Sequence, residues 1–197
     1  MKGTIITVLF FVLGCVLSIY DLTPAVLLEN DYSTYALYAL MGLVGVSLGM
    51  DEASINILKK VNVGLLLVPV SIGLGSILGS GLAYWLIAEP FVEGMAVGAG
   101  FGYYSLSSII ISNTYDSILG VIALISNISR ELISLLMAPV LVKAFGKMSP
   151  IASAGATSMD TTLPVITRFS GKEYALIALF SGIVLTILVP LLIPLIL

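Results

Sequence analysis

The chain has 197 residues, of which 59% are hydrophobic and only 10% are charged. A soluble domain carries roughly a quarter of its residues as charged side chains, so a water-soluble globule is excluded. The formal net charge of −3 argues against a nucleic-acid partner. With one cysteine and no histidine, we expect no disulfide, no metal site and no cofactor. No Walker-type phosphate loop and no nucleophile–base pair stands out, so we expect neither ATP binding by that route nor an enzyme.

Five stretches are apolar over about the 20 residues that a helix needs to cross a bilayer. They are Thr4–Tyr20, Ser33–Met50, Val61–Ala88, Ser117–Val142 and Tyr174–Leu197. The first follows Lys2 like a signal peptide, but it is longer than the usual apolar core and no small-residue cleavage site follows it, so we expect it to be retained. The sequence therefore predicts an all-α integral membrane protein with a single membrane domain over residues 1–197.

Two further apolar segments, Gly94–Ile111 and Pro150–Phe169, are unsuited to simple spans. The middle of each is crowded with Gly, Ser or Thr, and the second half becomes apolar again. Irregular backbone is tolerated at membrane depth only where it lines a cavity or is buried in protein. We therefore predict two re-entrant or broken helices.

The distribution of charges predicts how the chain is oriented. If the two irregular segments re-enter and the five others cross, seven of the eight basic residues lie in the cytoplasm, as the positive-inside rule requires. The N-terminus is then inside and the C-terminus outside. The irregular segments enter from opposite sides, so that their tips meet near the midplane, which is typical of inverted-repeat transporters.

Asp160 is the most informative single residue. It lies in G-A-T-S-M-D-T-T-L-P, among the hydroxyls of Thr157, Ser158, Thr161 and Thr162. An intramembrane acid is expensive and indicates a functional site. A carboxylate beside hydroxyls suits a cation: an ammonium group, sodium or a proton. The alternative is that Asp160 or Thr161 merely caps a broken helix end.

The first irregular segment contains Gly100, Gly102, Tyr103 and Tyr104, followed by serines that include Ser105 and Ser107. Glycines allow close approach of backbone to a ligand or to a neighbouring helix, and small-residue packing is the simpler explanation for them. Packing does not explain two tyrosines and several serines at membrane depth. A tyrosine face can hold a cation, so we predict that this stretch lines the site.

A third polar group interrupts the fourth predicted span. Asn127, Arg130 and Glu131 lie within about one turn, with Asn127 and Glu131 on one face. Arg130 could neutralise Glu131 or pair with Asp160 across the bundle. A structural ion pair and a functional site are both consistent with this pattern.

These motifs together resemble the LysO-type lysine exporter family, over most of the chain. The resemblance rests on G-F-G-Y-Y-S-L-S at 100–107, on R-E-L at 130–132 and on G-A-T-S-M-D at 155–160. It implies export of L-lysine and toxic lysine analogues across a prokaryotic inner membrane. It also implies that Asp160 is the essential intramembrane acid, with the stretch from Gly100 to Ser107 opposite it.

The sequence departs from the family pattern in two ways. Longer members begin with additional N-terminal spans, so this chain resembles only their C-terminal two-thirds. A homodimer or a complex with a small subunit that supplies the N-terminal section is therefore expected. Second, members often carry Asp three residues before the Arg-Glu pair, where this chain has Asn127.

We therefore predict a secondary transporter that exports lysine or a related cationic amino acid, with Asp160 holding the substrate ammonium or an exchanging proton. The first alternative is a sodium-coupled carrier of an organic anion, with Arg130 on the substrate. The second is a non-transporting membrane subunit of a larger complex, although such a subunit has no need of an intramembrane acid.

Overall fold

The computed structural model describes residues 63–197 continuously and scattered positions between 9 and 50. Apart from those positions, the predicted spans Thr4–Tyr20 and Ser33–Met50 lie outside the described residues. The chain divides into two compact units, Met1–Ala36 and Leu37–Leu197, and all of 63–197 belongs to the second. Regular structure within 63–197 is entirely helical.

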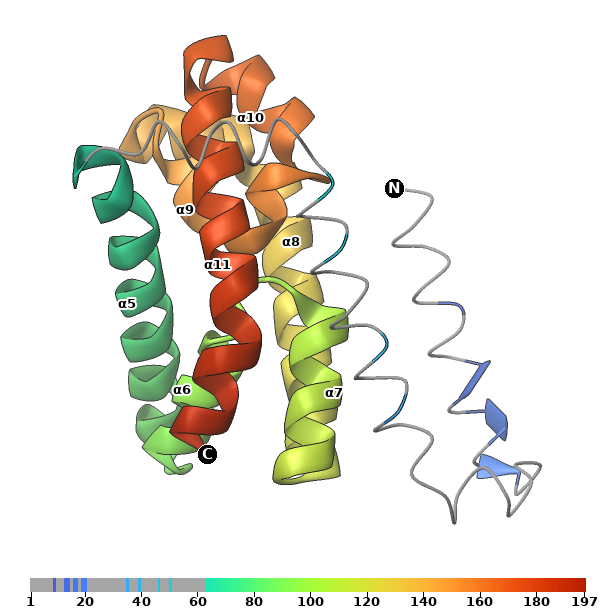
Figure 1. Cartoon of the computed structure of the whole chain (residues 1–197). Coiled ribbons are helices and arrows are strands. Elements are labelled where there is room, and N and C mark those ends of the chain that lie inside the picture. Colours follow the sequence, from blue (N-terminus) through green and yellow to red (C-terminus); the bar gives the residue numbers. More distant parts are fainter. Residues whose placement is uncertain are drawn as a thin grey trace. The chain divides into compact units, whose positions relative to one another are not determined.

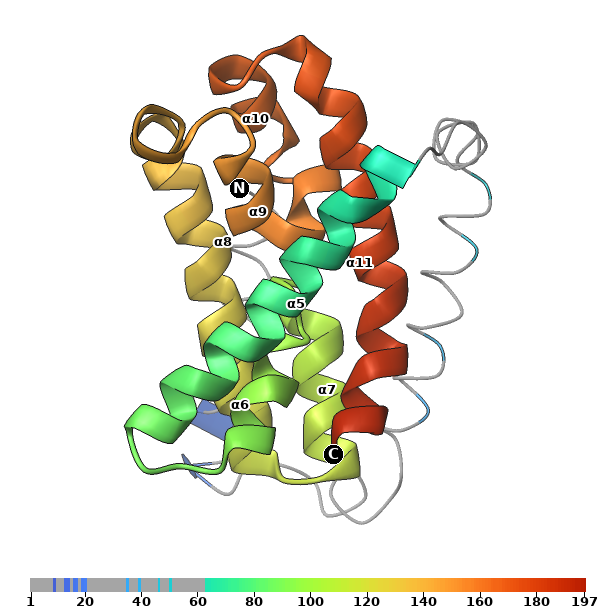
Figure 2. The same ribbon diagram turned by 90° about the vertical axis from the view of Figure 1, so that its left-hand side faces the viewer.

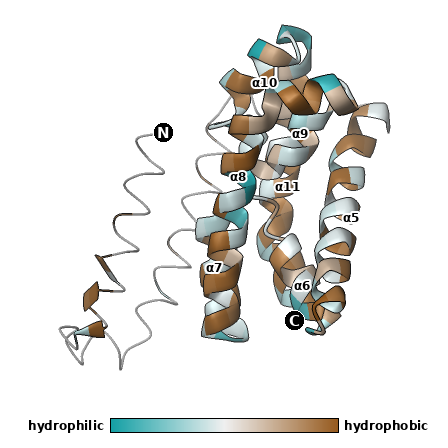
Figure 3. Cartoon of the chain, turned by 180° about the vertical axis from the view of Figure 1, so that it is seen from behind, coloured by the Kyte–Doolittle hydropathy of each residue, from teal (hydrophilic) through white to brown (hydrophobic). Residues whose placement is uncertain are grey.

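Three helices of this unit are long and apolar enough to cross a bilayer: α5 (Val63–Leu86), α8 (Ser117–Phe145) and α11 (Ala175–Ile196). The shortest has 22 residues, or about 33 Å at 1.5 Å per residue, which matches a hydrocarbon layer of about 30 Å. Their ribbons are mostly brown and white in Figure 3, as expected for helices surrounded by lipid. Their bounds agree with the last three predicted apolar stretches to within three residues.

The first irregular segment is a helix broken at its glycine-rich centre. It consists of α6 (Phe91–Gly98) and α7 (Tyr104–Thr114), which are separated by residues 99–103. Phe101 and Gly102 have φ angles of 49° and 91°, a left-handed conformation in which a right-handed helix cannot continue. The predicted interruption is therefore present.

The second irregular segment is also interrupted. α9 (Ser149–Ala154) leads into the tighter 3₁₀ turn η1 (Gly155–Met159), and α10 (Leu163–Phe169) follows after an irregular stretch. Pro164 lies in the first turn of α10, where the missing amide hydrogen costs nothing. This proline therefore lies at the beginning of a helix and does not interrupt one. A short 3₁₀ turn, η2 (Lys172–Tyr174), then leads into α11.

The two broken segments approach each other from opposite ends of the long helices. α6 and α7 lie at the end where α11 finishes, and α9 and α10 lie toward the end where it starts (Figures 1 and 2). α6 packs on α5, α7 packs on α8, and η1 packs on α11. Small residues allow these close contacts: a Cβ on Gly98 would lie 2.6 Å from the carbonyl oxygen of Ser76 in α5. The breaks are thus held inside the bundle.

Candidate functional site

The two breaks touch each other directly. The amide of Ala156 donates to the carbonyl oxygen of Phe101 at 2.8 Å. Glycine is needed on both sides of this crossing. Gly102 has φ +91° and approaches Ala154 so closely that a Cβ would lie 2.8 Å from its carbonyl oxygen. Gly155 has φ +66°, and a Cβ there would collide with the Phe101 carbonyl oxygen. The crossing therefore explains these two glycines through close backbone approach.

Asn127 of α8 holds the first break in place. Its side-chain oxygen accepts from the amide of Gly102 at 2.7 Å, and its side-chain nitrogen donates to the carbonyl oxygens of Val97, at 3.2 Å, and Ala123, at 2.9 Å. The side chain is 3% exposed. Both donor hydrogens and the acceptor oxygen are thus occupied by backbone groups, which makes Asn127 a brace for the broken segment.

Arg130, one turn further along α8, holds the second break. Its Nε donates to the carbonyl oxygen of Ser153 at 2.8 Å, and Nη2 donates to that of Ala152 at 3.1 Å. These carbonyls belong to the last turn of α9, where helix geometry leaves them without intrahelical partners. The third bond runs from Nη1 to the hydroxyl of Ser76 in α5, at 2.6 Å. The guanidinium therefore ties α5, α8 and α9 together.

The ion pairs predicted for Arg130 are absent. Within the described residues the only ion pair with an N–O distance of 4.0 Å or less is Lys147–Glu173, so Arg130 pairs with neither Glu131 nor Asp160. Successive residues of an α-helix project about 100° apart, so Arg130 and Glu131 leave α8 in different directions. The prediction of a neutralising pair was wrong on this point.

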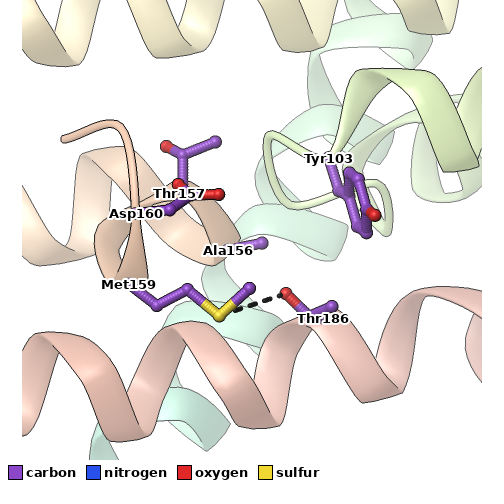
Figure 4. Close-up of a pocket in the computed structure, with 6 residues that line it drawn as sticks. All are labelled: Tyr103, Ala156, Thr157, Met159, Asp160 and Thr186. Carbon is purple, nitrogen blue, oxygen red and sulfur yellow. Dashed lines mark hydrogen bonds between the residues drawn. The ribbon is translucent and has the colours of Figure 1, made fainter. Parts of the chain in front are cut away.

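A small pocket opens beside the crossing, with a volume of about 70 Å³. Both broken segments and α11 line it, through Tyr103, Ala156, Thr157, Met159, Asp160 and Thr186. Figure 4 shows Asp160 and Thr157 on one wall, with Tyr103 entering from the other broken segment. The Met159 sulfur and the Thr186 hydroxyl close one side at 3.9 Å. The space is enough for an ammonium group, a small cation or a few waters.

Asp160 does not cap α10. Its Oδ1 accepts from the amide of Thr161, the next residue, and from the Thr161 hydroxyl at 3.3 Å. α10 begins after Thr162 and has no side-chain cap. The capping alternative is correct to this extent: Asp160 satisfies one backbone donor, the Thr161 amide, beside the end of η1, but it does not cap α10. The carboxylate stays available to the pocket, and the Thr161 hydroxyl orients it.

Glu131 is a second acid near this pocket. It is 1% exposed, and neither carboxylate oxygen has a hydrogen-bond partner among the described residues. Asp160 and Thr161 are close enough to act on it electrostatically, although the Thr161 hydroxyl does not reach it with hydrogen-bond geometry. A buried carboxylate without a partner is rare in stable structures, because it loses its hydration without replacement.

The remaining predicted hydroxyls bond to backbone instead of facing the pocket. Ser158 donates toward the carbonyl oxygens of Gly155, at 2.7 Å, and Ala178, at 2.8 Å, which fastens η1 to α11. Thr162 donates to the carbonyl oxygen of Thr157 at 2.8 Å. Both are fully buried. Of the four hydroxyls around Asp160, that of Thr161 bonds its carboxylate, and Thr157 lines the same pocket.

In the first broken segment only Tyr103 lines the pocket. Gly100 packs against Ser107, since a Cβ on Gly100 would lie 2.8 Å from the Ser107 hydroxyl oxygen. Ser107 is buried and bonds to the carbonyl oxygen of Tyr104, the first residue of α7. Ser105 is half-buried on the same helix. The stretch therefore combines one pocket residue with residues that pack.

Three residues that build the site were missed by sequence reasoning. Met159 and Thr186 line the Asp160 pocket, and Ser76 bonds Arg130. Met159 lies inside the motif but has no charge or hydroxyl to mark it. Thr186 and Ser76 are hydroxyl residues within apolar spans, and a hydroxyl in such a span was a usable signal.

Comparison with known proteins identifies the family. The family described as lysine exporter LysO matches residues 8–197. The chain belongs to this family. A LysO relative from Escherichia coli (strain K12), "Lysine exporter LysO", is 32% identical over 164 residues. A relative from Haemophilus influenzae (strain ATCC 51907 / DSM 11121 / KW20 / Rd), named "Putative lysine exporter", is 32% identical over 163 residues.

Each LysO alignment covers 83% of this chain. It covers 83% of the Haemophilus protein but 54% of the E. coli protein, so the chain spans about half the length of the latter. No solved structure matches the chain. Family membership and the three long apolar helices establish a membrane protein of an amino-acid exporter family.

Proposed function

We propose that the chain exports L-lysine, or a related cationic amino acid, across the cytoplasmic membrane in exchange for protons. The observation that supports this most directly is the position of Asp160. Its carboxylate lies in a pocket built from both broken segments, which is where transporters with broken helices bind their solute. A carboxylate there attracts an ammonium group or a proton.

The other walls of the pocket suit a cation as well. Tyr103 presents an aromatic ring from the opposite segment, and a cation above an aromatic face is attracted by about 0.5–2 kcal/mol. The Thr157 hydroxyl donates to the carbonyl oxygen of Ala154 at 3.1 Å, so its lone pairs remain for an N–H donor. No basic residue lines the pocket.

Glu131 suggests how a proton is coupled to export. Two acids that influence each other electrostatically, one of them without a hydrogen-bond partner, are poorly accommodated when both are ionised. A bound proton or a substrate ammonium relieves this repulsion, and binding of one disfavours binding of the other. Such competition is what exchange of lysine for protons requires.

The test is uptake of radiolabelled lysine into inverted vesicles that contain only this chain, with and without an imposed proton gradient. We expect gradient-driven uptake by the wild type and none by Asp160→Asn, which preserves size but removes the charge. Glu173→Gln is the matched control, because Glu173 is an exposed acid outside the pocket. Full gradient-driven uptake by Asp160→Asn would contradict the mechanism.

Two further arms separate the alternatives. Uptake driven by sodium and inhibited by simple carboxylates would favour a sodium-coupled organic-anion carrier. Absence of transport that is restored by a co-purifying small subunit would favour the proposed complex with an N-terminal section, while a homodimer would be active alone.

The orientation is part of the proposal: multi-pass in the inner membrane, with the N-terminus inside and the C-terminus outside. Reporter fusions after Leu197 test it. A periplasmic alkaline phosphatase is expected to be active there and a green fluorescent protein to be dark. The reverse pattern would place the C-terminus in the cytoplasm.

A further inference from the structure

A second cavity lies on the α5 side of the bundle and shares no residue with the Asp160 pocket. This groove has a volume of about 400 Å³ and is bordered by α5, α8 and α9. Its polar and small lining residues are Ser71, Gly75, Ser76, Gly79, Ser80 and Arg130. The volume falls in the range of small-molecule sites, whereas the Asp160 pocket is far smaller.

Arg130 brings a positive charge into this groove that no acid of the described residues balances. Its three hydrogen bonds all go to uncharged oxygens. The carbonyl end of α9 offsets part of the charge. At the depth of α8 in a membrane, an unbalanced guanidinium is costly, and a bound anion would relieve that cost.

The donors of Arg130 are not exhausted. A guanidinium has five N–H groups, and three are used by the bonds from Nε, Nη1 and Nη2. Each terminal nitrogen therefore keeps one N–H without a partner among the described residues. Two N–H groups on the planar end of a guanidinium match the two oxygens of a carboxylate.

The serines of α5 offer the complementary chemistry. The Ser71 hydroxyl donates to the carbonyl oxygen of Val68 at 2.9 Å, and the Ser80 hydroxyl donates to that of Ser76 at 2.7 Å. Since both hydrogens are committed to the helix backbone, the oxygens are left as acceptors. The groove thus presents a cationic donor and neutral acceptors together, which suits a group that carries both charges.

We propose that this groove binds the zwitterionic head group of the amino-acid substrate. The α-carboxylate pairs with Arg130, and the α-ammonium donates to the hydroxyl oxygen of Ser80, which lies about one helical turn from Ser76, the partner of Arg130. The inference rests on the proposed function and adds to it: Asp160 recognises a cation, while the groove requires an α-amino acid. Diamines and other cations that lack the head group are discriminated against here.

Competition against labelled lysine in wild-type inverted vesicles tests the chemistry. Cadaverine and lysinamide lack the carboxylate, and 6-aminohexanoate lacks the α-ammonium. We expect each to compete about tenfold or more weakly than unlabelled lysine, the scale of losing a charge-assisted hydrogen bond. Equal competition by cadaverine, in a protein that transports lysine, would overturn the assignment.

Filling the groove tests its location without touching Arg130. A Cβ on Gly75 or Gly79 meets no atom within 4 Å, so the described fold has room for Gly75→Leu and Gly79→Leu. Both are expected to raise the KM for lysine about tenfold while the thermal midpoint stays at the wild-type value. Leu82→Phe is the control, because Leu82 is exposed on the same helix but does not line the groove.

Arg130→Lys completes the set. It retains the charge but not the paired N–H groups, so the preference for lysine over cadaverine should fall. An unchanged KM in both glycine variants, or a change in their oligomeric state, would overturn the proposal; the latter would make the groove a helix-docking surface. If the wild type does not transport lysine, the proposed function itself is overturned. This outcome differs from the others, because all of them are measured on a protein that transports lysine.

Discussion

Asn127 and Arg130 are one turn apart on α8, and each bonds the backbone of a different broken segment. Asn127 holds Gly102 in the first break, and Arg130 holds Ser153 at the end of α9. The two breaks also bond to each other through Ala156 and Phe101. A single stretch of one helix therefore sets the position of both irregular segments, and with them the position of the pocket.

Replacement of Asn127 by Leu is expected to destabilise the protein more than replacement by Asp. Leu leaves the Gly102 amide without its partner and removes one of the two donors to the Val97 carbonyl oxygen, at a cost of about 1–3 kcal/mol. Asp keeps the acceptor for Gly102 and, in its protonated form, still donates one hydrogen bond to a neighbouring carbonyl oxygen. Thermal unfolding in detergent measures the difference, with Ser126→Ala on the exposed neighbouring position as control. Equal midpoints for the two variants would mean that the bond to Gly102 contributes little.

Gly155→Ala and Gly146→Ala form a matched pair that separates the effect of the contact between the two broken segments from the effect of backbone strain. Both glycines have positive φ, so either alanine costs about 1–2 kcal/mol in backbone strain. A Cβ on Gly146 meets nothing within 4 Å, whereas one on Gly155 collides with the Phe101 carbonyl oxygen. We expect a clearly larger fall in thermal midpoint and a loss of lysine uptake for Gly155→Ala only. Similar effects of both variants would show that the close contact between the two broken segments contributes little to stability or to uptake.

Glu131→Gln is expected to keep or raise thermal stability while it reduces gradient-driven lysine uptake. Among the described residues the carboxylate has no hydrogen-bond partner to lose, so replacing it with an uncharged amide of the same shape removes a desolvation cost. If Glu131 served only in packing, the variant would show the opposite combination: lower thermal stability with normal lysine uptake. Midpoint and uptake measured on the same preparation decide between the two.

Gly182→Val is expected to displace η1 from α11. A Cβ on Gly182 would lie 2.6 Å from the Cβ of Met159 and 2.8 Å from the carbonyl oxygen of Ala156, so rigid backbone would have to move. Overpacking of this kind costs about 1–3 kcal/mol. Because Met159 and Ala156 line the Asp160 pocket, uptake should fall together with stability. Gly79→Ala, with open space around its Cβ, controls for loss of glycine in a span.

The helical elements are encoded locally, in the pattern of apolar residues along the chain. Long apolar runs form α5, α8 and α11, because a helix satisfies its own backbone groups and needs no distant partner in lipid. The interruptions at 99–103 and 155–162 followed from local glycine and hydroxyl content for the same reason. Asp160 was recognisable because a carboxylate in an apolar run is rare whatever surrounds it.

Which polar groups meet depends on how the helices pack in three dimensions. Arg130 donates hydrogen bonds to Ala152 and Ser76 rather than to an acid. Ser158 donates a hydrogen bond to Ala178 and does not face the pocket. These partners lie 20 or more residues apart. Their contacts exist only because two broken helices cross, and no local periodicity encodes where unwound backbone leaves carbonyls without partners. Hydrogen bonds to such carbonyls compete with ion pairing for the same side chain. In this structure the Arg130 side chain donates to the carbonyl oxygens at the end of α9 and forms no ion pair with the described acids.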